Sequence, residues 1–184
     1  SRARMNTPAK KRLPVVAGNW KMHGSRAENA ALIEALLAAG TIDERAACIV
    51  CPPYIYVAEV ARRLAGSPIG VGAQDVSAES QGAFTGEVAA AMLVDVGCTH
   101  VLVGHSERRA LNGENDELVA RKFAAALGRG LAPILCVGEQ LAERDAGQTH
   151  TVVARQLDAV LAVSGVAALG KALVAYEPVW AIGT

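Results

Sequence analysis

The sequence lacks the long apolar segments that cross membranes or direct secretion. None of its apolar runs approaches the roughly 20 residues that a membrane-spanning helix requires. Residues 1–12 also lack the apolar stretch of a secretory signal peptide. We therefore expect no membrane partner and a cytoplasmic location.

No charge of one sign is in excess, because the chain holds 18 basic and 18 acidic residues. Residues 1–12 nevertheless contain five basic residues and no acidic one, and the remainder carries 13 basic and 18 acidic residues, a net charge of −5. A mildly acidic body argues against nucleic acid as a partner. We interpret residues 1–12 as a basic disordered leader, or as an addition from cloning before Met5, rather than as a binding arm.

Cysteine is scarce, and its spacing does not favour a metal site or a disulfide. Cys48 and Cys51 form a C-x-x-C pair, but zinc would need a second ligand pair. Cys48 lies inside an apolar run, and two prolines follow Cys51, which is unlike a redox motif at a strand–helix junction. We expect these residues, with Cys98 and Cys136, to pack as small hydrophobic side chains in a reducing compartment.

The composition is that of a folded chain, with 52% hydrophobic and 20% charged residues. Six short apolar runs are each followed by a helical pattern or a polar loop, and most are continuous, which is typical of strands buried on both faces of a parallel sheet. This alternation predicts an α/β fold in one domain over residues 13–184. The expected strands are Val15–Ala17, Ala47–Cys51, Ile69–Ala73, His100–Val103, Ala132–Val137 and Ala172–Tyr176.

The intervening helices carry their own signals. Ser25 and Glu28 form a capping box. Three apolar faces follow at helical spacing, and each ends at glycine. These faces are Leu32, Ile33, Leu36 and Leu37 before Gly40; Leu118, Phe123, Ala126 and Leu127 before Gly128 and Gly130; and Val153, Leu157, Val160 and Leu161 before Gly165.

Polar side chains follow five of the six expected strands at the ends where ligands bind in α/β proteins. The first strand–helix junction is not G-x-G-x-x-G, which counts against dinucleotide binding. The convergence of these groups at one rim predicts an active site. They are Asn19 and Lys21; Gln74 and Asp75; His105, Ser106 and Glu107; Glu139; and Glu177.

Three of these residues have the chemistry of a proton-transfer site. Pro178 biases Glu177 away from helix, so its carboxylate lies at the rim, where apolar Val179, Trp180 and Ile182 can shield it and make it a better base. A helix beginning after His105 would favour the neutral imidazole, which can donate to an oxyanion. Lys21 provides a cation for a phosphate or an enolate oxygen. Taken singly, each fits an ordinary structural or surface role better than a catalytic one.

Together these residues lie in segments that resemble the triosephosphate isomerase family. The resemblance extends over residues 13–184 and implies a (β/α)8-type barrel. The segments are Gly18-Asn-Trp-Lys-Met22, Gly72-Ala-Gln-Asp-Val76, Val103-Gly-His-Ser-Glu-Arg-Arg109, Leu135-Cys-Val-Gly-Glu139 and Ala175-Tyr-Glu-Pro-Val-Trp-Ala-Ile-Gly-Thr184.

The resemblance implies a cofactor-free isomerase of triose phosphates, acting in glycolysis and gluconeogenesis. Glu177 would be the base, His105 the electrophile and Lys21 the substrate-binding cation. Asn19 and Gly183 would also bind substrate. Ser106 and Glu107 would support the histidine, and whether Glu107 orients Lys21 or accepts from a buried donor remains open.

The resemblance also implies a homodimer. The loop between residues 76 and 87 would insert into a second subunit, with Thr85 near that subunit's active site and Phe84 at the tip covered by the partner.

The resemblance falls short at the end of the sequence. A complete barrel takes about 250 residues, and we count six strands, so we expect the last two βα units to be absent. This keeps open an alternative, a catalytically inactive barrel fragment that acts only as a scaffold or binding surface. Another phosphate-using barrel enzyme, such as an aldolase, has less support because no Schiff-base lysine stands at a strand end.

Overall fold

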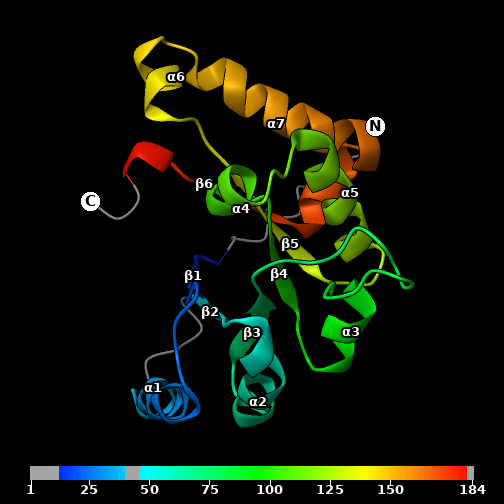
Figure 1. Cartoon of the computed structure of the whole chain (residues 1–184). Helices are drawn as coiled ribbons and strands as arrows, with labels where there is room; N and C mark the ends of the chain where they lie inside the picture. The colour runs from blue at the N-terminus through cyan, green and yellow to red at the C-terminus, as the bar shows by residue number, and fades with distance from the viewer. Residues whose placement is uncertain (1–12, 40–45, 182–184) are drawn as a thin grey trace, which may run out of the picture.

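The computed structural model describes residues 13–39 and 46–181. Their strands form a curled, wholly parallel sheet in chain order from β1 to β6, and helices follow the strands in alternation (Figure 1). The strands are β1 Val15–Asn19, β2 Ala47–Cys51, β3 Ile69–Ala73, β4 His100–Val103, β5 Ala132–Val137 and β6 Leu173–Tyr176. The expectation of an α/β, TIM-barrel-type fold with six strands is confirmed.

In Figure 1, α1 and α2 lie below the strands, α3 lies to their right, and α6 and α7 lie above them. The helices are α1 Arg26–Ala38, α2 Tyr54–Leu64, α3 Ala90–Asp95, α4 Ser106–Leu111, α5 Asp116–Leu127, α6 Leu141–Asp145 and α7 Thr149–Ser164, with 3-10 turns η1 Val166–Lys171 and η2 Val179–Ala181. None of the described helices is long and apolar enough to span a membrane.

The two faces of the sheet have separate hydrophobic clusters because side chains alternate along a strand. Val50, Val71 and Val101 point to the helices and join a large cluster that includes Phe123 of α5. Neighbouring positions on the opposite face form a smaller cluster of Ile49, Cys51, Leu102, Ile134 and Cys136. Three of the four cysteines are buried and all four have free thiols, which agrees with the expected packing as small hydrophobic side chains.

The outer strands are less buried than the sequence predicts. Val16 of β1 is 64% exposed and Val174 of β6 is 48% exposed. Each of these strands pairs on one side only within the described sheet. The expectation of burial on both faces is therefore wrong for β1 and β6, although it holds for the central strands.

The helix signals are confirmed in part. Ser25 caps α1 by accepting a hydrogen bond from the backbone N–H of Glu28 at 3.2 Å. Ile33 is buried as expected, but Leu32 and Leu37 are 43% and 44% exposed, so the buried face of α1 is narrower than predicted. Gly40 lies outside the described residues.

The predicted apolar face of α7 is confirmed in part. Val160 is buried as expected, and Val153 and Leu157 are partly buried against the large cluster. The most buried row also contains Val152 and Gln156, and a glutamine is not included in a search for apolar spacing.

Candidate active site

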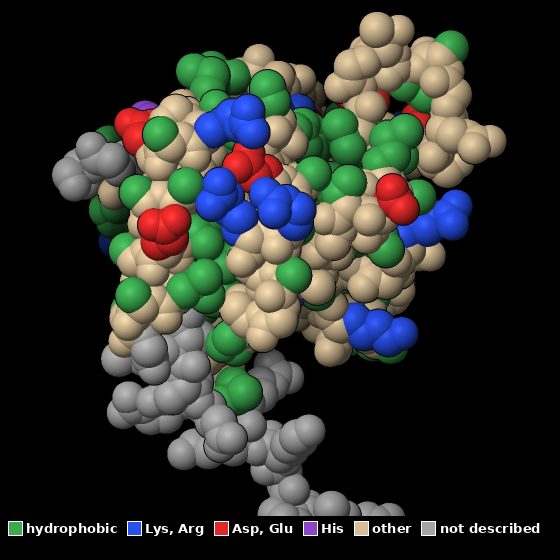
Figure 2. Space-filling view, turned by 90° about the horizontal axis from the view of Figure 1, so that it is seen from below, with side chains coloured by type: hydrophobic (Ala, Val, Ile, Leu, Met, Phe, Trp, Pro, Cys, Tyr) green, Lys and Arg blue, Asp and Glu red, His purple; other side chains and the backbone are tan. Residues whose placement is uncertain are grey.

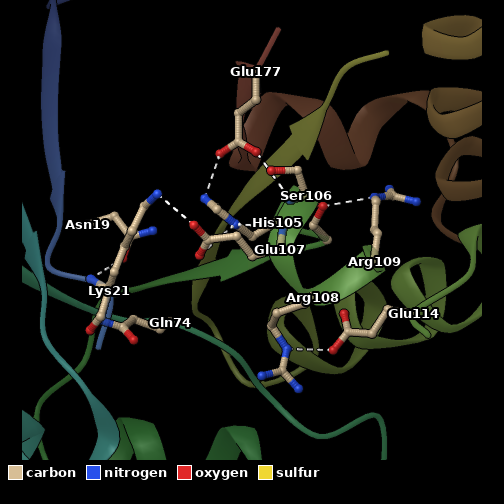
Figure 3. Close-up of polar contacts among 11 residues, drawn as sticks. Asn19, Lys21, Gln74, His105, Ser106, Glu107, Arg108, Arg109, Glu114 and Glu177 are labelled. Carbon is tan, nitrogen blue, oxygen red and sulfur yellow. Dashed lines mark hydrogen bonds and ion pairs between the residues drawn. The ribbon is translucent and has the colours of Figure 1, made fainter. Parts of the chain in front are cut away.

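The strand register brings the carboxyl ends of the strands to one rim. Asn19 is opposite Cys51, and Val137 is opposite Tyr176. Lys21, His105 and Glu177, which follow β1, β4 and β6, meet at this rim with Asn19, Ser106 and Glu107 (Figure 3). The structure therefore brings together six of the residues that the sequence suggested for the site.

Lys21 has an unusual backbone conformation, with φ of +53°. This left-handed region is uncommon for a residue with a side chain and costs conformational energy. Two neighbours hold it in place: Asn19 Oδ1 accepts from Lys21 N at 2.9 Å, and Gln74 Nε2 donates to Lys21 O at 2.8 Å. The same Gln74 amide donates to Cys51 O at 2.9 Å, which ties the loop after β1 to the end of β2.

The Lys21 ammonium is paired with Glu107. Its Nζ lies 2.6 Å from Glu107 Oε1, and both side chains are partly exposed. The hydrogen bond from Lys21 lowers the pKa of the Glu107 carboxyl below its ordinary value. Of the two partners left open for Glu107, the structure shows the ion pair with Lys21.

His105 is buried and caps the short helix α4. Its Nδ1 accepts a hydrogen bond from the backbone N–H of Glu107 at 3.2 Å. In the neutral ring the proton is then on Nε2. A helix begins after His105, as predicted. The Nε2 atom of His105 faces Glu177.

Glu177 follows β6 directly and is held at both ends. Its backbone N–H donates to Val137 O at 2.7 Å. Its Oε1 lies 3.2 Å from His105 Nε2, and its Oε2 accepts from the backbone N–H of Ser106 at 3.3 Å. Figure 3 shows the carboxylate directed at the histidine and the start of α4. At this separation the carboxylate and the imidazole are in direct hydrogen-bond contact, and each is a group that can exchange a proton with a molecule bound beside them.

Charged side chains hold α4, which carries no buried residue. Arg108 pairs with Glu114 at 2.6 Å and with Asp75 at 2.9 Å, and Lys122 Nζ lies 2.8 Å from Asp75 Oδ1 and 2.5 Å from Glu114 Oε1. Two acids and two bases thus balance in a network that we call the buried quartet: Asp75, Arg108, Glu114 and Lys122. Arg109 adds a bond of 2.8 Å to Gly104 O.

The segment after Glu177 is bound to the end of β5. Glu139 is fully buried, and its carboxylate accepts from Tyr176 Oη at 2.9 Å and from Trp180 Nε1 at 3.1 Å. The Arg144 guanidinium lies 4.2 Å from the centre of a Trp180 ring. Trp180 was expected to shield Glu177; the structure instead shows its indole bonded to Glu139. Ile182 lies outside the described residues.

The remaining site predictions fall elsewhere. Gly183 lies outside the described residues. Phe84 and Thr85 are in the loop between β3 and α3, which runs out from the body in Figure 1, and Phe84 is 46% exposed. Among the described residues, no group of three or more histidine, cysteine or acidic side chains is placed to hold a metal ion.

Figure 2 shows lysine and arginine side chains beside acidic ones on the face seen from below, with hydrophobic side chains spread among them.

Two polar residues were given no role in the site by the sequence analysis. Gln74 was noticed only as a polar residue after a strand, and its bonds to Lys21 O and Cys51 O required the fold. Gln156 bonds to Gly138 beside Glu177. The signal that could have found it is its place in the row of α7 residues at positions 152, 156 and 160.

Comparison with known proteins gives one family. A model of the triosephosphate isomerase family matches residues 14–184. The triosephosphate isomerase of Thiobacillus denitrificans is 62% identical over 173 residues, covering 94% of this chain and 68% of that protein. Those of Dechloromonas aromatica and Cupriavidus taiwanensis are 60% and 57% identical over the same length, covering 69% and 70% of those proteins.

Proposed function

Because the chain belongs to the triosephosphate isomerase family, we propose that it interconverts dihydroxyacetone phosphate and D-glyceraldehyde 3-phosphate through an enediolate. The observation that carries this proposal is the juxtaposition of Glu177 Oε1 and His105 Nε2 at 3.2 Å. Lys21 lies on the same rim, and its ammonium is the cation that pairs with Glu107.

We assign the roles from the resemblance to the family, and the geometry of the site is compatible with them. Glu177 removes a proton from the carbon next to the carbonyl, and it returns the proton to the neighbouring carbon. His105 donates its Nε2–H to the carbonyl oxygen as negative charge develops there. It recovers a proton from the neighbouring hydroxyl as the new carbonyl forms, so the neutral ring acts as an acid and is regenerated. This division of work between a glutamate and a neutral histidine is that of the triosephosphate isomerase family.

Lys21, Asn19 and Gly183 complete the substrate-binding set. The Lys21 ammonium attracts the phosphorylated substrate and stabilises the enediolate oxygen. Glu107 holds the ammonium near the rim before the substrate enters, and Ser106 orients Glu177 through its backbone N–H. The reaction moves a proton between adjacent carbons with no net oxidation, so it requires no cofactor.

We also propose that residues 13–184 form one domain, that two copies form a homodimer and that the enzyme works in the cytoplasm. The exposed Phe84 in a protruding loop supports the dimer, because a large aromatic side chain at such a place is typical of an interface. Sedimentation of the parent and of a Phe84→Glu variant tests it. A dimer that the substitution dissociates is the expected result, and a monomeric parent would refute it.

Turnover by the chain of 184 residues tests the function. The sample should have its mass confirmed, and a Glu177→Asp variant purified in parallel reports contamination by the host isomerase. Shortening the side chain withdraws the carboxylate from the reacting carbon, and we expect kcat to fall about 100-fold or more. Equal low activity in both samples would reject the proposal and favour the inactive scaffold.

A further inference from the structure

The backbone of Glu177 lies unusually close to Gly138, the residue that follows β5. A Cβ built on Gly138 would stand 1.8 Å from the carbonyl oxygen of Glu177 and 2.7 Å from its carbonyl carbon. Both atoms are backbone, so no side-chain movement can relieve the contact. Position 138 must therefore be glycine for Glu177 to occupy its observed place.

Gly138 is itself held by Gln156 of α7. The Gln156 amide accepts from Gly138 N at 2.8 Å and donates to Gly138 O at 3.1 Å, so one side chain satisfies both polar groups of the same residue. Gln156 is 5% exposed. A glutamine buried in an otherwise apolar row is costly unless its amide is hydrogen-bonded, and these two bonds engage its oxygen and its nitrogen.

A pocket of about 300 Å³ adjoins this arrangement, and Gly138, Gln156 and Glu177 all line it. Close packing therefore does not fix Gly138 on the pocket side, and the two bonds from Gln156 supply that restraint. Glu177 in turn is bonded to Val137 O through its N–H and abuts Gly138 through its carbonyl. The Gln156 side chain thus contacts the backbone of Gly138, and the backbone of Gly138 contacts that of Glu177.

We infer that Gln156 and Gly138 are positioning residues for the Glu177 carboxylate, which they hold at its distance from His105 without touching the substrate. The inference rests on the proposed role of Glu177 as the base. Movement of the Glu177 backbone displaces the carboxylate from the reacting carbon, whereas Lys21 and Asn19, which lie at the end of β1, stay in place. The chemical step should therefore suffer more than substrate binding.

The test uses two variants and two matched controls in the whole chain. Gln156→Met removes both bonds and keeps the length of the side chain, and Gly138→Ala adds the Cβ. Val152→Ala truncates another buried residue of α7, and Gly170→Ala adds a Cβ that meets nothing within 4 Å. Steady-state kinetics and hydrogen exchange of the Glu177 backbone N–H are measured for each.

We expect kcat to fall about tenfold or more in Gln156→Met and Gly138→Ala, with KM within about twofold of the parent, while both controls stay within about threefold. The Glu177 N–H should exchange at least about tenfold faster in Gln156→Met than in Val152→Ala. If Gln156→Met matches Val152→Ala in both measurements, or raises KM alone, the inference is wrong. If the parent shows no turnover, the proposed function fails, and the exchange rates still decide whether Gln156 holds Glu177.

Discussion

Lys21 Nζ lies 2.6 Å from Glu107 Oε1, and this ion pair joins the loop after β1 to the start of α4. The two segments come from separate parts of the chain and meet only at the rim of the sheet. Glu107 also supplies the backbone N–H that fixes the His105 tautomer. One residue thus orients both the cation and the acid of the proposed site.

The pair should stabilise the fold in a pH-dependent way. Because Lys21 lowers the pKa of Glu107, the contribution is present above the ordinary carboxyl pKa and is lost as the pH falls through the lowered value. The side chains are 37% and 45% exposed, so it amounts to at most about 1 kcal/mol. Thermal unfolding should show Glu107→Gln below the parent at neutral pH and level with it in acid. A difference that persists unchanged in acid would contradict this account.

Loss of the His105 donor should slow the chemical step. In His105→Gln the proton is carried by a flexible amide rather than by a ring held at 3.2 Å from Glu177, and we expect kcat to fall about 100-fold. His100 is a matched control because it lies at the opposite end of the same strand. Steady-state kinetics of His100→Gln should stay within about threefold of the parent, and equal losses in both variants would argue against the assignment.

Removal of one member of the buried quartet should destabilise the chain. Lys122→Met leaves Asp75 and Glu114 with less compensation for their buried charge, and we expect a loss of about 3–5 kcal/mol in the free energy of unfolding. The neighbouring Arg121 forms an exposed pair with Glu79, so Arg121→Met should cost at most about 1 kcal/mol. Denaturant titration measures both values. If the two variants lost similar amounts of unfolding free energy, removing a partner from the buried quartet would be no more destabilising than breaking an exposed ion pair.

The buried thiols should resist alkylation in the folded chain. Burial raises the pKa of Cys51 to about 12 and that of Cys98 to about 11, so little thiolate forms at neutral pH. Cys48 is only partly buried and should react first with iodoacetamide. Mass spectrometry after limited labelling identifies the modified residue, and labelling in guanidinium should reach all four cysteines. Early modification of Cys51 would contradict the described packing.

Much of the fold was predictable because each strand is a short, nearly continuous apolar run. The expected bounds of β2, β3, β4 and β5 match the structure, and β1 and β6 differ only at their ends. Exposure of Val16 and Val174 was not predictable from the runs themselves. Burial depends on which neighbours flank a strand, and this is a property of the sheet rather than of the segment.

Part of the site was also predictable, since polar side chains after parallel strands converge at one rim. His105 and Glu177 could be named in this way, although the distance between them could not be predicted. The choice of Lys21 as the partner of Glu107 required coordinates, because both side chains are long and flexible. Gln156 was missed because its role depends on hydrogen bonds to two backbone atoms of Gly138. A pattern of residue types does not show which backbone atoms a side chain will contact.

The backbone conformation of Lys21 is unfavourable for any residue with a side chain, although the proposed chemistry requires a side chain there. Glycine adopts a φ of +53° without penalty, so a chain selected only for stability would favour glycine there. Retaining a lysine trades stability for a charge at the rim. If Lys21 binds substrate as proposed, position 21 combines a functional charge with a backbone conformation that is unfavourable for a residue with a side chain.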